Sequence, residues 1–135
     1  MSADAAATKT CDCLIVGAGP AGMAAAIELS RAGRDVLVAD ENPAPGGQIY
    51  RNVAAGAPAS IFGADYVAGR TLVEAFAVSG ARHQAATTVF LIERRDDGAF
   101  DVALSQAGAA RLVRAKAVLI ATGALERPFP IPGWT

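Results

Sequence analysis

The chain has 135 residues, a length that fits one domain of ordinary size. Hydrophobic residues make up 53% of it, and 12 basic residues stand against 13 acidic ones, for a net charge of −1. Because no basic stripe is visible, neither a nucleic acid nor an anionic membrane is expected as a partner.

The N-terminal segment predicts neither a membrane span nor a secretion signal. The longest uncharged run, residues 13–27, is too short to span a bilayer readily and is interrupted by glycines and a proline. Asp4 and Asp12 stand where a signal peptide would carry positive charge. We therefore expect residues 1–10 to be a disordered leader, no transmembrane segment, and a cytoplasmic location.

The first structured elements predict one βαβ unit. Residues 13–16 are an apolar run typical of a buried parallel strand. Residues 20–32 are rich in helix formers and are followed by Gly33, a residue that commonly ends helices. Residues 35–39 form a second apolar strand, so the crossover between the two strands should be right-handed.

The remainder of the chain predicts a loop, a second helix and several strands. Residues 42–63 are rich in glycine and proline and predict a loop, and residues 65–79 predict a helix. Short turns separate three β segments, which predicts an antiparallel meander. The expected strands are residues 82–85, the meander segments 88–95, 99–105 and 110–114, and a separate apolar strand at 116–121.

A glycine-rich loop lies between the first strand and the first helix. Gly17, Gly19 and Gly22 fit the pattern G-x-G-x-x-G, in the strand–loop–helix context that makes this pattern specific for a dinucleotide. The first glycine permits a tight turn, the second lets the backbone approach a pyrophosphate, and the third lets helix and strand pack closely. The helix N-terminus adds free N–H groups and partial positive charge for the phosphates.

An acidic residue ends the second strand. Asp40 lies 23 positions after Gly17, near the place where a carboxylate accepts hydrogen bonds from ribose hydroxyls. Glu41 is the neighbouring alternative for this role. The glycine loop and the acid together predict a dinucleotide site but leave open whether the ligand is FAD or NAD.

The cysteines and the single histidine favour structural rather than chemical roles. Cys11 and Cys13 form a C-x-C at a strand entrance, but a zinc or iron–sulfur site needs about four ligands. We interpret both as small buried strand residues and expect no metal site. His83 is interpreted as a strand residue, since no carboxylate partner is evident nearby. No catalytic residue is expected in this chain.

Two later motifs carry a resemblance to a flavoprotein class. The string D-E-N-P-A-P-G-G-Q-I-Y-R at residues 40–51 and the string A-T-G-A-L-E-R-P-F-P-I-P-G-W at residues 121–134 follow apolar strands. They resemble flavoproteins with two dinucleotide-binding domains, a class that includes thioredoxin reductase. The longer strings are most similar to the FAD subunits of opine oxidases, hydrogen cyanide synthase, and hydroxyproline or sarcosine dehydrogenase and oxidase complexes.

The resemblance implies an α/β fold: a Rossmann-like, glutathione-reductase-like FAD-binding domain with an antiparallel β-meander, here incomplete. By position, the three glycines line the pyrophosphate, Asp40 holds the adenosine ribose, and Val89 offers its backbone to the adenine. The cofactor-binding residues that the resemblance implies are Gly17, Ala18, Gly19, Pro20, Ala21, Gly22, Asp40, Glu41, Gly46, Gly47, Gln48, Arg51, Val89, Ala121, Thr122 and Gly123.

The resemblance also implies a domain plan. Residues 11–127 should be the N-terminal part of the FAD-binding domain, and residues 128–135 the start of a linker to a second nucleotide-binding domain. We therefore expect a fragment that is inactive alone. NAD(P) or an iron–sulfur cluster would belong to parts outside this chain.

The reaction implied for the whole protein is oxidation of an amine or amino acid, such as an opine, a proline-like or a sarcosine-like compound, by hydride transfer to FAD. Another oxidoreductase subunit is an expected partner. Two alternatives stay open. One is an NAD(P)H-dependent reductase of the thioredoxin or ferredoxin reductase type, and the other is a non-catalytic protein that binds flavin.

Overall fold

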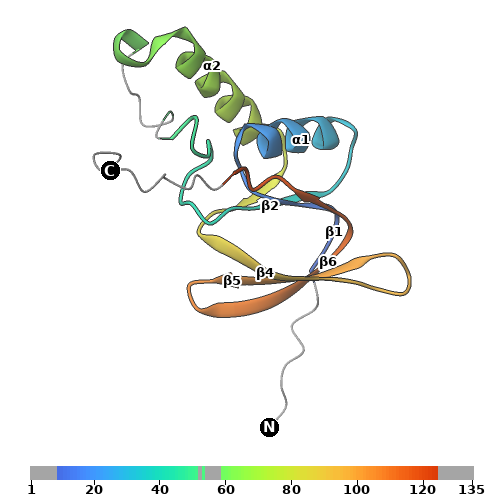
Figure 1. Cartoon of the computed structure of the whole chain (residues 1–135). Coiled ribbons are helices and arrows are strands. Elements are labelled where there is room, and N and C mark those ends of the chain that lie inside the picture. Colours follow the sequence, from blue (N-terminus) through green and yellow to red (C-terminus); the bar gives the residue numbers. More distant parts are fainter. Residues whose placement is uncertain (1–8, 52, 54–58, 125–135) are drawn as a thin grey trace.

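The computed structural model describes residues 9–51, 53 and 59–124, in which six strands form one mixed sheet (Figure 1). The strand order is β3-β2-β1-β6-β5-β4. Strands β1, β2, β3 and the second half of β6 are parallel, whereas β4, β5 and the first half of β6 form an antiparallel meander. The elements are β1 (Lys9–Val16), α1 (Pro20–Arg31), β2 (Val36–Ala39), α2 (Ala59–Ala77), β3 (Arg82–Gln84), β4 (Thr87–Arg94), β5 (Phe100–Gln106) and β6 (Ala109–Ile120).

The predicted βαβ unit is confirmed. Strands β1 and β2 pair in parallel from Cys13 opposite Val36 to Val16 opposite Ala39, and α1 connects them. Helix α1 begins at Pro20, whose missing N–H costs nothing in the first turn, and Gly33 follows its end with φ of 73°. A φ in this left-handed region is easily adopted only by glycine.

Strand β1 begins four residues earlier than expected. Lys9 and Thr10 pair with Val113 and Arg114 of β6, so the expected leader was too long at its C-terminal end. The reason is tertiary, because the polar start of β1 is held by ladder hydrogen bonds to a strand more than 100 residues away. The rest of the expected leader, residues 1–8, lies outside the described residues.

Strand β6 corrects the prediction of two separate strands at 110–114 and 116–121. It runs without a break for 12 residues. Residues 109–115 pair antiparallel with β5, and residues 113–120 pair parallel with β1. Neither glycine nor proline interrupts this stretch, so one long strand continues from the meander into the parallel sheet and joins the two halves.

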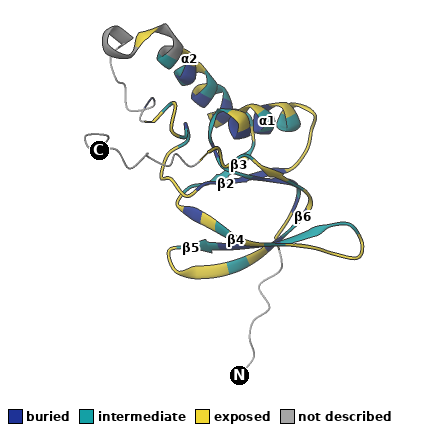
Figure 2. Ribbon diagram, viewed as in Figure 1, coloured by how far each residue is buried: buried dark blue, intermediate teal, exposed yellow. Residues whose placement is uncertain are grey.

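Two apolar cores lie on opposite faces of the parallel strands. On one face, Ile15 and Val38 pack with Met23 of α1 and with Phe76 of α2. On the other face, a second core joins Leu14 to the meander. Figure 2 shows buried segments in both helices and in strands of the sheet. Both helices therefore cover the same face, and the meander folds beneath the opposite one (Figure 1).

Helix α2 begins and ends earlier than the predicted range 65–79. It extends from Ala59 to Ala77 with a non-helical residue, Gly63, at φ of 79°. At its C-terminal end the Ser79 hydroxyl donates to the Phe76 carbonyl oxygen at 2.7 Å, and this hydrogen bond takes the place of a further helical one.

Within the described residues, neither helix is long and apolar enough to cross a membrane. The expected linker, residues 128–135, lies outside them.

Candidate dinucleotide-binding site

An elongated cleft lies at the carboxyl ends of the parallel strands β1, β2 and β6. It has a larger chamber of about 700 Å³ and a smaller one of about 250 Å³, which share Gly17, Asp40, Glu41, Asn42 and Thr122. The larger chamber is lined by the glycine loop, the 46–51 loop and residues 121–124. The smaller one is lined by the strand ends with Thr87 and Val89. This edge of an open α/β sheet is where ligands generally bind.

The glycine loop has the geometry that the sequence predicts. Gly17 has φ of 105°, and a Cβ there would stand 2.5 Å from the backbone oxygen of Ala121. A Cβ on Gly22 would stand 2.0 Å from the Gly17 oxygen, so the helix packs directly on the loop. A Cβ on Gly19, in contrast, would meet only the Cα of Gly47, at 4.0 Å, which is an ordinary van der Waals contact. The loop backbone is therefore accessible from the cleft at Gly19.

The N-terminus of α1 points its partial positive charge into the larger chamber. Gly19 is the N-cap residue, no side chain caps the first turn, and the first turn holds no acidic residue. Pro20 and Ala21 line the chamber at this point. The free amide groups of a first helical turn and the helix dipole both favour a phosphate here.

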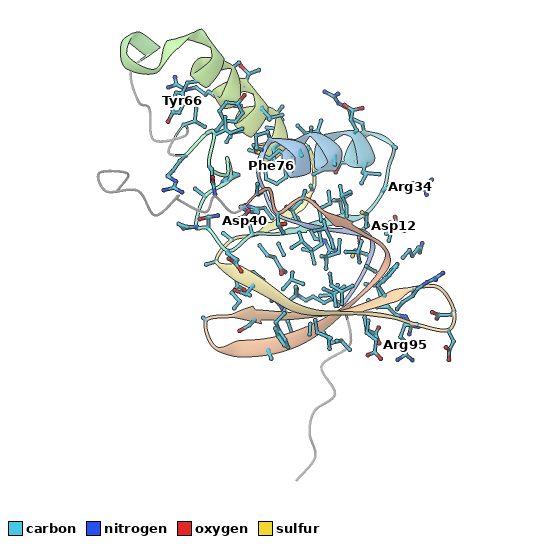
Figure 3. The ribbon with its side chains drawn as sticks, in the orientation of Figure 1. Asp12, Arg34, Asp40, Tyr66, Phe76 and Arg95 are labelled. Carbon is cyan, nitrogen blue, oxygen red and sulfur yellow. The ribbon has the colours of Figure 1, made fainter. Side chains whose placement is uncertain are left out.

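The two acids after β2 have different environments. Asp40 is only 7% exposed, and its carboxylate accepts hydrogen bonds from the Ala18 N–H and from both nitrogens of Asn42 (Figure 3). Its own backbone bonds to the Gln84 oxygen and the Thr87 N–H. Asp40 thus connects the glycine loop to two neighbouring turns.

Glu41 is exposed and lines both chambers, so its carboxylate is open to a ligand. The expected ribose role of Asp40 remains a prediction, and the geometry favours Glu41 for it. Sequence spacing did not distinguish the two acids, because burial of Asp40 depends on a contact between residues 22 positions apart.

The 46–51 loop lies directly over the glycine loop. Gly46 has φ of 130° and its N–H donates to the Ala18 oxygen at 2.9 Å. A Cβ on Gly47 would stand 3.0 Å from the Gly19 Cα, so two glycines permit this close approach. The Gln48 side-chain amide reaches the Ala124 carbonyl oxygen at 3.4 Å across the larger chamber.

The remaining predicted positions also gather at the cleft. Thr122 lines both chambers, Ala121 and Gly123 line the larger one, and Val89 lines the smaller one. The Ala121 N–H donates to the Val16 oxygen at 2.8 Å, which holds this segment beside the glycine loop. The structure therefore brings residues from the four predicted segments into one cleft.

Some residues of the cleft were not predicted from the sequence. Thr87 lines the smaller chamber, Ile49 lines the larger one, and Asn42 lines both. The Asp-x-Asn spacing at 40–42 is a local signal for a side-chain turn and would have identified Asn42. Thr87 has no such signal, because its place depends on how the turn after β3 packs beneath Asp40.

The thiols and the histidine lie apart from this cleft. Cys11 and Cys13 are buried and unpaired, and burial raises the pKa of the Cys11 thiol to about 11 against the opposing charge of Arg82. His83 lies in β3 with its ring edge-on to Phe76 at 5.5 Å, and burial lowers its pKa. Among the described residues, no group of three or more His, Cys, Asp or Glu side chains could hold a metal ion.

Comparison with known proteins identifies the family of this chain. The family described as pyridine nucleotide-disulphide oxidoreductase matches residues 11–135. The chain belongs to this family. The match covers nearly the whole chain and confirms the predicted resemblance, with its Rossmann-like α/β fold.

Individual relatives are similar over most of the chain. The A subunit of opine oxidase from Agrobacterium tumefaciens (strain Ach5) is 49% identical over 130 residues, which are 92% of this chain and 26% of that protein. The alpha subunit of sarcosine oxidase from Corynebacterium sp. (strain P-1) is 40% identical over 136 residues, which cover 87% of this chain and 13% of that protein. The thioredoxin reductase structure from Streptococcus pyogenes MGAS5005 has a TM-score of 0.66 at 29% sequence identity, and the match covers 94% of this chain and 40% of that one.

The chain thus spans about a quarter of the length of its opine oxidase relative and a smaller share of its sarcosine oxidase relative. These similarities support an FAD-binding segment of an oxidoreductase.

Proposed function

We propose that this chain binds the ADP half of FAD and the beginning of its ribityl chain. The observation that carries the proposal is the two-chambered cleft, in which the α1 N-terminus lines the larger chamber and the exposed Glu41 lines both. The pyrophosphate would lie against Gly17 and Gly19, and the adenosine in the smaller chamber near Val89. The uncapped N-terminus of α1 and the exposed Glu41 carboxylate fit the pyrophosphate and the ribose of this group.

Side chains along the cleft can pair with the parts of the cofactor that would lie against them. The Glu41 carboxylate would accept hydrogen bonds from the adenosine ribose hydroxyls. Asp40 would hold the glycine loop in place for the pyrophosphate through the Ala18 N–H. Arg51 and Gln48, exposed in the larger chamber, would lie along the phosphate and ribityl side.

We further propose that the whole protein oxidises an amine or amino acid and works with another oxidoreductase subunit. The support is the similarity to proteins named as subunits of opine oxidase and sarcosine oxidase. Bound flavin would supply the hydride acceptor. This chain's residues would bind and orient it, and none of them is assigned a proton-transfer role.

Acid extraction tests the ligand. The purified protein should release FAD, identified by its chromatographic mobility and fluorescence. A protein that releases NAD and no flavin would contradict the proposed ligand. A mock purification from cells that lack the expression plasmid is the control for free cellular flavin.

The flavin absorption band tests the substrate class. Anaerobic addition of an opine, sarcosine or a proline-like amino acid to the whole protein should bleach the band. The likeness to thioredoxin reductase favours a second candidate, an NAD(P)H-dependent reductase. Bleaching by NADPH with no response to any amine would support that candidate and contradict amine oxidation.

A further inference from the structure

The loop that carries Gly47, Gln48 and Arg51 is packed against helix α2 by an aromatic contact. Tyr50 lies in this loop, and Gly69 of α2 is buried beneath its ring. A Cβ built on Gly69 would stand 2.2, 2.4 and 2.6 Å from three ring carbons of Tyr50. Carbon atoms in contact stand about 3.5–4.0 Å apart. No side chain fits at position 69 while the ring stays in place.

Gly69 is needed for space rather than for backbone conformation. It is not one of the glycines with positive φ, and it lies within the helix after the kink at Gly63. Alanine is a much better helix former than glycine. A Gly69→Ala substitution would therefore favour the helix itself and oppose only the contact with Tyr50.

A second contact joins the same helix to the same loop. The Tyr66 hydroxyl donates to the Arg51 carbonyl oxygen at 2.7 Å, so the Tyr66 side chain reaches from α2 to the loop (Figure 3). Tyr66 and Gly69 are three residues apart, so they share one face of α2. The loop is tight as well, since the Tyr50 N–H donates to the Gly46 oxygen at 3.2 Å. Movement of Tyr50 would be passed directly to Gly46.

We propose that α2 clamps the 46–51 loop in place, with Gly69 and Tyr50 as the positioning residues for the cofactor groups beyond the pyrophosphate. This inference rests on the proposed function. It predicts that the larger chamber is disturbed more than the smaller one, because Gln48 and Arg51 line the larger chamber whereas the smaller chamber is formed without the 46–51 loop. Loss of the clamp should weaken FAD binding more than ADP binding, since ADP can meet the 46–51 loop only through its phosphates and lacks the ribityl chain and the flavin ring.

The test is a double-mutant cycle on the apo-protein, with FAD and ADP titrated separately. Gly69→Ala should weaken FAD binding at least about fivefold, the range expected from overpacking a well-filled site. Tyr50→Ala should weaken it similarly, and the double variant should be no weaker than either single variant. In each variant the fold-loss of ADP affinity should be less than about half the fold-loss of FAD affinity. Ala77→Ser, which adds one atom on the exposed end of α2, is the matched control.

The outcomes separate this inference from the proposed function. Three results would overturn the clamp alone. They are wild-type affinity for FAD in Gly69→Ala, additive losses in the double variant, and equal losses of FAD and ADP affinity. Failure of the wild-type protein to bind FAD would overturn the proposed function and the clamp with it. If Gly69→Ala does not fold, Tyr66→Phe takes its place. A larger loss of FAD affinity than of ADP affinity supports the clamp, and unchanged FAD affinity or equal losses of the two refute it.

Discussion

Replacement of the two adjacent acids should separate ligand binding from loop support. Glu41 is exposed in both chambers, so Glu41→Ala removes an acceptor without disturbing the folded apo-protein. A charge-assisted hydrogen bond contributes about 1.5–3 kcal/mol, and an exposed site favours the lower end. FAD affinity should therefore fall about tenfold, with an unchanged melting temperature of the apo-protein.

Asp40→Ala should act by lowering the stability of the folded protein and removing the support of the glycine loop. The substitution leaves the N–H of Ala18 without its acceptor, and Ala18 is fully buried, whereas Asn42 is exposed and can turn to water. An unsatisfied buried donor costs about 1–3 kcal/mol. The melting temperature of the apo-protein should fall by several degrees, and FAD binding should weaken because the glycine loop is no longer held.

Differential scanning fluorimetry of the apo-variants and FAD titration by fluorescence quenching measure the two effects. Glu41→Gln, which keeps the length of the side chain and a neutral acceptor, should lose less FAD affinity than Glu41→Ala. The reasoning is refuted if Asp40→Ala weakens FAD binding while its melting temperature stays at the wild-type value. That result would return the ribose role to Asp40.

Three further predictions concern the loop, the histidine and the thiols. Gly17→Ala should lower the melting temperature more than Gly108→Ala does, because both positions have positive φ but only a Cβ at Gly17 meets backbone within 4 Å; equal losses would contradict the steric argument. Burial lowers the pKa of His83 below its ordinary value of 6.5, so the unfolded chain binds the proton more readily than the folded one. The free energy of unfolding should therefore fall as pH drops below about 6.5. Urea titrations of His83→Gln should show a weaker pH dependence, and an unchanged dependence would exclude His83 as its source. Cys11, with its pKa raised to about 11, should react with a thiol reagent at neutral pH only on unfolding; rapid labelling of the folded protein would show that the thiol is accessible.

The βαβ unit and its glycine loop could be predicted because their signals are local. Apolar runs of strand length, helix formers after Pro20 and the spacing of Gly17, Gly19 and Gly22 all act within a few residues of each other. The acid at the end of β2 is also a local signal. These features fix the edge of the sheet at which a dinucleotide would bind.

The continuity of β6 could not be predicted in this way. A run of β-forming residues does not reveal whether one strand or two will form, because that depends on its partners. Here the partners are β5 on one side and β1 on the other, and β1 lies about 100 residues earlier in the chain.

The sequence by itself determined the fold class and the segments that form the cleft, because strand and helix periodicity and glycine spacing are properties of neighbouring residues. Only the tertiary structure decided which acid is buried and which is exposed, and why α2 has a glycine at position 69. Asp40 is buried by its bond to the Ala18 N–H, and Gly69 is required by the ring of Tyr50. Both depend on contacts between residues about 20 positions apart, which no local pattern encodes.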